Sequence, residues 1–107
     1  MAQFQRISAA AAIERLAQHP EAQLLDIRAR ADFNQGHIPG AAYFTQDQLP
    51  LMAKRLSKDT PILIYCYHGN ASQTFAQFFI DFRFTQVFSI DGGYEHLSKL
   101  LTPQVSA

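Results

Sequence analysis

The chain has 107 residues, 48% of them hydrophobic, and its nine acidic residues balance nine lysines and arginines. That length accommodates one domain around one core, and the hydrophobic fraction excludes a disordered chain. The zero net charge gives no electrostatic reason to expect binding to nucleic acid or to an anionic membrane surface. No apolar stretch is long enough to span a membrane, and residues 1–8 lack the apolar segment of a signal peptide. We therefore expect a single domain, residues 1–107, and a cytoplasmic location, because the one cysteine cannot form an internal disulfide.

The first predicted elements are a strand and a helix. An apolar stretch over residues 4–7 predicts the strand, and an alanine-rich segment predicts the helix, which Ser8 is suited to cap at its N-terminus. The inner face of this helix is expected to carry Ile13, Leu16 and Ala17.

The next predicted elements are two strands and a helix. The strands cover residues 24–27 and 41–44, with one helical turn near residues 31–34 and a glycine-bounded turn at residues 36–40 between them. A helix is expected over residues 50–56, because the proline at its start suits a first-turn position.

The second half of the chain holds the most apolar strand, residues 61–65, and a further strand at residues 87–90. Between them a helix is predicted over residues 72–82, with Ser72 as its N-cap. A last helix follows residues 91–93. The core-facing residues of these two helices are expected to be Phe75, Phe78, Phe79 and Phe82 in the first, and Tyr94, Leu97 and Leu101 in the second.

Apolar strands that alternate with helices are typical of an α/β fold. The five strands predict a central, mostly parallel five-stranded sheet with helices on both faces. Ligands of such folds bind beyond the carboxyl ends of the strands, and Cys66 lies at that end of the most apolar strand.

Cys66 is the candidate nucleophile, because it lies where a strand ends, a short loop turns and a helix begins. The backbone N–H groups of such a loop and of the first helical turn converge into an anion site. The same groups favour thiolate over thiol and lower the pKa of the cysteine. This placement suits a cysteine that reacts with an anion.

Three segments resemble the rhodanese family. Residues 25–28 (LDIR), 32–33 (DF) and 36–41 (GHIPGA) resemble its amino-terminal signature, and residues 90–94 (IDGGY) resemble its carboxyl-terminal one. The loop at residues 66–72 (CYHGNAS) is similar to that of GlpE-type single-domain thiosulfate sulfurtransferases. The resemblance implies a single rhodanese-like domain in which Cys66 carries sulfur.

The activity that this resemblance implies is thiosulfate sulfurtransferase. The sulfane sulfur of thiosulfate would pass through a Cys66 persulfide to cyanide or to thiol and dithiol acceptors such as thioredoxin, with release of sulfite. Two displacements at one nucleophile give ping-pong kinetics. Sulfite leaves without a proton, so no general acid is required.

The loop residues are expected to bind the substrate mainly through backbone N–H groups. These residues are Tyr67, His68, Gly69, Asn70, Ala71 and Ser72. Gly69 and Asn70 allow the positive φ angles that turn such donors inward. His68 has an open role: it could orient the substrate or serve as a base, or the loop could simply tolerate it. No basic residue lies between Cys66 and Ile80, so backbone dipoles must hold thiosulfate, and we expect a weak KM.

Other polar residues are expected to be structural. Asp26 and Arg28 end a strand, and we expect an ion pair that fixes the strand end. His37 is expected to be a hydrogen-bonded turn residue, and His19 and His96 to lie at or near the surface. One cysteine and four scattered histidines match no metal-ligand spacing, so we expect no metal. The resemblance to the rhodanese family implies no cofactor.

Two alternative functions compete with this interpretation. Phosphatases and arsenate reductases with a Cys-x5-Arg loop need the arginine to clamp an oxyanion, and Ser72 stands at that position instead. The other alternative, a rhodanese-like sulfur carrier or redox-sensing module that acts with a partner protein, remains open. Turnover distinguishes it, because a carrier stops after one equivalent of sulfite.

Overall fold

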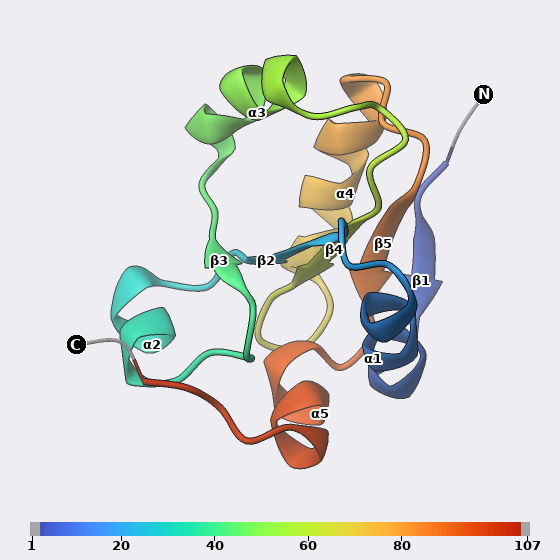
Figure 1. The fold of residues 1–107 in the computed structure, drawn as a ribbon. Helices are drawn as coiled ribbons and strands as arrows, with labels where there is room; N and C mark the ends of the chain where they lie inside the picture. Colours follow the sequence, from blue (N-terminus) through green and yellow to red (C-terminus); the bar gives the residue numbers. More distant parts are fainter. Residues whose placement is uncertain (1–2, 106–107) are drawn as a thin grey trace.

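The computed structural model describes residues 3–105, and a five-stranded sheet lies at its centre (Figure 1). Every strand pairing is parallel, and the strand order is β1-β5-β4-β2-β3. The strands are β1 (Gln5–Ile7), β2 (Gln23–Asp26), β3 (Ala42–Tyr43), β4 (Ile62–Tyr65) and β5 (Val87–Ile90). The α/β fold with a central parallel sheet is therefore confirmed.

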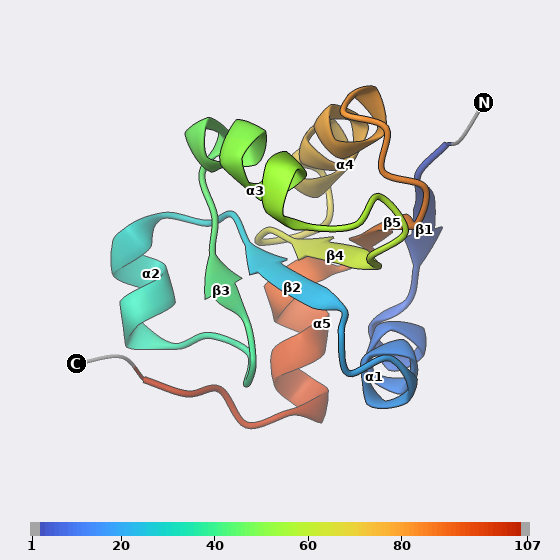
Figure 2. The ribbon, with the colours of Figure 1, turned by 45° about the horizontal axis from the view of Figure 1, so that its top comes forward.

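Helices cover both faces of this sheet, as predicted. In Figures 1 and 2, α3 and α4 lie on one face, α1 and α5 lie on the other, and α2 lies beside the β3 edge. The helices are α1 (Ala9–Gln18), α2 (Arg30–Gln35), α3 (Leu49–Arg55), α4 (Ala71–Asp81) and α5 (Gly93–Leu100), and a short 3-10 turn, Gln46–Gln48, precedes α3. Within residues 3–105, no helix has both the length and the apolar character needed to cross a membrane.

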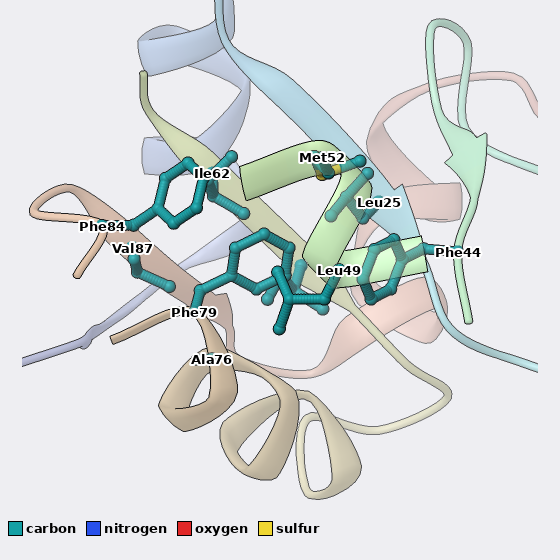
Figure 3. Packing of buried hydrophobic residues seen from close by; sticks show 10 residues of the cluster. Leu25, Phe44, Leu49, Met52, Ile62, Ala76, Phe79, Phe84 and Val87 are labelled. Carbon is teal, nitrogen blue, oxygen red and sulfur yellow. The ribbon is translucent and has the colours of Figure 1, made fainter. Parts of the chain in front are cut away.

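Each face of the sheet has its own hydrophobic core, because successive side chains of a strand point to opposite faces. In β4, Ile62 and Ile64 join the core under α3 and α4, whereas Leu63 and Tyr65 join the core under α1 and α5. Figure 3 shows the first core, in which side chains of α3 and α4 meet those of the strands. All four residues of β4 are buried, as expected of a central strand.

The sequence predicts serine N-caps for two helices, and one of them is confirmed. The Ser8 hydroxyl accepts a hydrogen bond from the N–H of Ala11 and caps α1. The assignment of Ser72 as the cap of the later helix is wrong. That helix, α4, begins at Ala71 after Asn70, and no side chain caps it.

Two residues assigned to helix inner faces lie at the surface. Phe79 is fully buried and Phe75 and Phe78 are half-buried, but Phe82 is 40% exposed. Phe82 follows the last residue of α4, so helical spacing no longer sets its direction. Ala17 is also exposed, and the buried positions of α1 are Ala9 and Ala12.

Candidate active site

Cys66 follows the carboxyl end of β4, and residues 67–70 connect it to α4. Its side chain is directed inward, and the residue is only 4% exposed. The N–H group of Gly69 donates to the Cys66 sulfur at 3.1 Å, and the N–H group of Ser72 donates to it at 3.3 Å. The loop therefore curls around the thiol and directs backbone donors at Sγ.

Gly69 makes this curl possible. Its φ angle is +100°, in the region that residues with a side chain rarely adopt. The residue also packs closely, since a Cβ atom built there would lie 3.0 Å from the backbone nitrogen of Gly92. The positive φ predicted for Gly69 is thus confirmed, whereas that predicted for Asn70 is wrong, because its φ is −93°.

The first turn of α5 holds the other side of the loop. The N–H of Tyr94 donates to the carbonyl oxygen of Cys66 at 2.8 Å, and the N–H of Glu95 donates to that of Tyr67 at 3.3 Å. N–H groups of a first helical turn have no partner inside their own helix, so these bonds satisfy both partners. These two bonds hold the start of the loop against α5.

Ser72 contributes a side chain as well as its backbone. Its Oγ lies 3.5 Å from the Cys66 sulfur and 2.7 Å from Oγ of Ser89 on β5. Ser72 and Ser89 are both fully buried. A serine hydroxyl therefore lies next to the thiol in a site shielded from water.

These neighbours favour the thiolate. Burial by itself raises the pKa of the Cys66 thiol, but the hydroxyl of Ser72 and the N–H groups of Ser72, Gly69 and His68 act against it. The result is a pKa below the ordinary value of the thiol. This agrees with the lowered pKa that the loop and helix pattern predicts.

Tyr67 connects the loop to α2. Its hydroxyl accepts a hydrogen bond from the N–H of Ala29 at 3.1 Å and donates one to the carboxylate of Asp32. That bond to Asp32 raises the pKa of Tyr67. Tyr67 is exposed, as are His68, Asn70 and Ala71, so these four residues form the rim of the site.

A buried ion pair supports the end of β2 beside the loop. Arg28 Nη2 lies 2.7 Å from Oδ2 of Asp26 and also donates to the carbonyl oxygen of Gly36 at 2.6 Å. The guanidinium carbon lies 3.8 Å from the centre of the Tyr94 ring. The predicted structural pair between Asp26 and Arg28 is confirmed.

Comparison with known proteins agrees with this geometry. Residues 8–100 match the model of the rhodanese-like domain family. The chain is 44% identical over 95 residues to thiosulfate sulfurtransferase GlpE of Tolumonas auensis, and the match covers 89% of each sequence.

The chain belongs to the rhodanese-like domain family.

Solved structures share the rhodanese fold. The Alr3790 protein of Anabaena sp. superposes with a TM-score of 0.81 at 23% identity, over 94% of this chain and 92% of that one. A rhodanese-like domain protein of Staphylococcus aureus superposes with a TM-score of 0.78 at 17% identity, over 97% of this chain and 100% of that one. At these identities the likeness shows the fold alone.

Sequence reasoning missed two parts of this rhodanese site. One is the bond from Tyr67 to α2, which joins residues far apart in the sequence. The other is Ser89, whose only sequence signal is a hydroxyl within an otherwise apolar strand, on the face that α4 covers.

Three of the four histidines lie outside the loop that follows Cys66. His37 is buried in its turn, with Nδ1 2.9 Å from the carbonyl oxygen of Phe33, as predicted. His96 is exposed and His19 is half-exposed. Among residues 3–105, no group of three or more His, Cys, Asp or Glu side chains is placed to hold a metal ion.

Proposed function

We propose that this protein is a thiosulfate sulfurtransferase that carries sulfane sulfur as a persulfide on Cys66. The observation that carries the proposal is the convergence of the N–H groups of Gly69 and Ser72 on a buried sulfur whose pKa is lowered. A relative that shares 44% identity over most of the chain bears the same activity in its name.

In the first half-reaction, the thiolate of Cys66 attacks the outer sulfur of thiosulfate. A bond forms between Sγ and that sulfur, the sulfur–sulfur bond of thiosulfate breaks, and sulfite leaves with the electron pair. Sulfite is a stable anion, so no proton needs to reach it. The outer sulfur stays bound to Sγ, and Cys66 is left as a persulfide.

In the second half-reaction, a nucleophilic acceptor attacks the outer sulfur of the persulfide. The sulfur–sulfur bond breaks, and its electron pair returns to Sγ of Cys66 as thiolate. Cyanide would give thiocyanate in an assay. In the cell, the acceptor would be a thiol or dithiol protein such as thioredoxin, which fits a reducing cytoplasm.

Backbone dipoles hold the anionic substrate in this proposal. The loop has no lysine or arginine, and Arg28 is buried against Asp26 and Gly36. Donors already aimed at the place where charge develops need no reorganisation during the reaction. Thiosulfate would contact the six residues of the loop, which are Tyr67, His68, Gly69, Asn70, Ala71 and Ser72. We therefore expect a higher KM for thiosulfate than in a site where a lysine or arginine side chain contacts the substrate.

The alternative remains a sulfur carrier or redox-sensing module that acts with a partner. Mass spectrometry after incubation with thiosulfate should show one added sulfur atom, about 32 Da, which cyanide removes, as covalent catalysis requires. The Cys66→Ser protein is the control and should gain no mass. Continuous sulfite release in the presence of cyanide supports the enzyme, whereas release that stops after one equivalent would identify a carrier.

The same proposal treats residues 1–107 as one domain. The five strands described within residues 3–105 form a single sheet, and both hydrophobic cores share its strands.

A further inference from the structure

Ser89 is a buried hydroxyl in an apolar strand. Its neighbours in β5 are Val87, Phe88 and Ile90, and all four residues are buried. Within residues 3–105, the partner of Ser89 Oγ is Ser72 Oγ, at 2.7 Å. A hydroxyl buried without a partner is costly, so this pair accounts for the presence of serine in the strand.

Ser72 connects Ser89 to the sulfur of Cys66. Its Oγ lies between Oγ of Ser89, at 2.7 Å, and Sγ of Cys66, at 3.5 Å. Each hydroxyl has one proton to donate and lone pairs that accept. Three polar groups, one directly after β4, one in α4 and one in β5, thus form a chain of contacts that ends at the reactive sulfur.

The direction of the chain depends on the state of Cys66. If the sulfur is a thiol, its S–H can donate to Ser72, and Ser72 can donate to Ser89. If the sulfur is a thiolate, it accepts only, so Ser72 donates to Sγ and Ser89 donates to Ser72. In that arrangement the hydroxyl of Ser72 accepts a hydrogen bond from Ser89, and its own proton is donated to the sulfur.

We propose that Ser89 is a positioning residue that, through the hydroxyl of Ser72, stabilises the thiolate of Cys66. A role of Ser89 in catalysis rests on the proposed function. In that function the thiolate appears twice, as the nucleophile toward thiosulfate and as the leaving group when the acceptor takes the outer sulfur. Hydrogen bonds that reinforce one another along a chain strengthen each member, so the effect of Ser89 reaches Sγ without contact.

The test compares Ser89→Thr with Ser89→Val. Both variants add a methyl group in the same buried place and are β-branched, which suits a strand, but only threonine keeps the hydroxyl. The readout is the rate of Cys66 alkylation by iodoacetamide as a function of pH. The chain has one cysteine, so the alkylated mass reports Cys66 alone.

The expected result is that Ser89→Val raises the alkylation pKa by about half a unit to one unit, while Ser89→Thr stays near the wild-type value. The acid limb of kcat/KM for thiosulfate should move by the same amount. Ser89→Ala should raise the alkylation pKa as Ser89→Val does. It adds no volume, so it still tests the inference if the two larger variants do not fold. Thermal melting of each variant reports the packing cost separately.

Equal alkylation pKa values in threonine, valine, alanine and wild-type proteins would overturn the inference and leave Ser89 as a purely structural residue. A wild-type protein that takes no sulfur from thiosulfate would instead contradict the proposed function. The alkylation profile needs no sulfur transfer, so the two failures are distinguishable.

Discussion

The backbone of Gly93 lies so close to the carbonyl oxygen of Cys66 that a Cβ atom at position 93 would be 2.4 Å from that oxygen. This contact is what allows the first turn of α5 to bind the carbonyl groups of the active loop. The φ angle of Gly93 is +52°, so a side chain there would also strain the backbone.

Gly93→Ala should therefore disrupt the active loop. The added methyl group must push α5 from the loop, which breaks the bond from the N–H of Tyr94 to Cys66 and lets the donors around Sγ turn away. We expect a loss of sulfurtransferase activity of about a hundred-fold or more, as is typical when a donor to developing charge is misplaced. Thiosulfate:cyanide rates of the folded variant are the measurement.

Gly40→Ala is the matched control. Gly40 has a φ of +86°, but a Cβ atom there would meet nothing within 4 Å. Alanine at position 40 thus introduces left-handed backbone strain of about 1–2 kcal/mol, but its methyl group clashes with no neighbouring atom. If Gly40→Ala lost as much activity as Gly93→Ala, strain alone would explain the effect, and the close contact would not.

The lowered pKa of Cys66 predicts two pH effects. Alkylation of the folded protein should have its inflection below the ordinary cysteine value of about 8.5, and the denatured protein should return to that value. The thiolate also stabilises the fold: this contribution is complete above the unfolded pKa and is lost as the pH falls through the folded pKa. Stability attributable to Cys66 should thus increase with pH between the two values.

The matching measurement is thermal melting of the wild type and of Cys66→Ser across that pH range. The stability difference between them should grow in favour of the wild type as the pH rises. A folded inflection at or above the denatured one would contradict the hydrogen-bond geometry around Sγ.

The sequence predicts features of this site that local rules determine. Cys66 lies between an apolar strand and an amphipathic helix, so its place at the edge of the sheet follows from periodicity. The positive φ of Gly69 follows from the residue type. Ser8 likewise caps α1, because the capping bond to Ala11 lies within one turn.

Features that depend on contacts between distant residues were not predictable in this way. Ser72 has the residue type of a helix cap, but the loop around Cys66 starts α4 one residue earlier, and the Ser72 hydroxyl contacts Ser89 instead. Asn70 tolerates a positive φ, yet Gly69 alone makes the sharp turn. No single-sequence pattern indicates either choice.

The buried pair of Asp26 and Arg28 predicts an asymmetric mutational response. Arg28→Met leaves the Asp26 carboxylate buried without its cation, and such a change typically costs about 3–5 kcal/mol of stability. The double variant Asp26→Leu with Arg28→Met removes both charges and should recover part of that loss. Denaturant unfolding of the single and double variants measures the difference, and a double variant less stable than Arg28→Met would refute it.

The last prediction separates backbone from side-chain binding of the substrate. His68 is exposed and its side chain is not needed in the proposed mechanism, so His68→Ala should lower activity only modestly. Gly69→Val should do far more harm, because a β-branched residue cannot readily adopt a φ of +100° and its Cβ would press on the backbone nitrogen of Gly92. With the N–H of Gly69 turned from the sulfur, we expect a loss of about a hundred-fold or more in kcat.

The measurement is the thiosulfate:cyanide rate of each variant after circular dichroism has shown that both are folded. An inactive His68→Ala beside an active Gly69→Val would make the imidazole, and not the backbone donors, the principal partner of the anion.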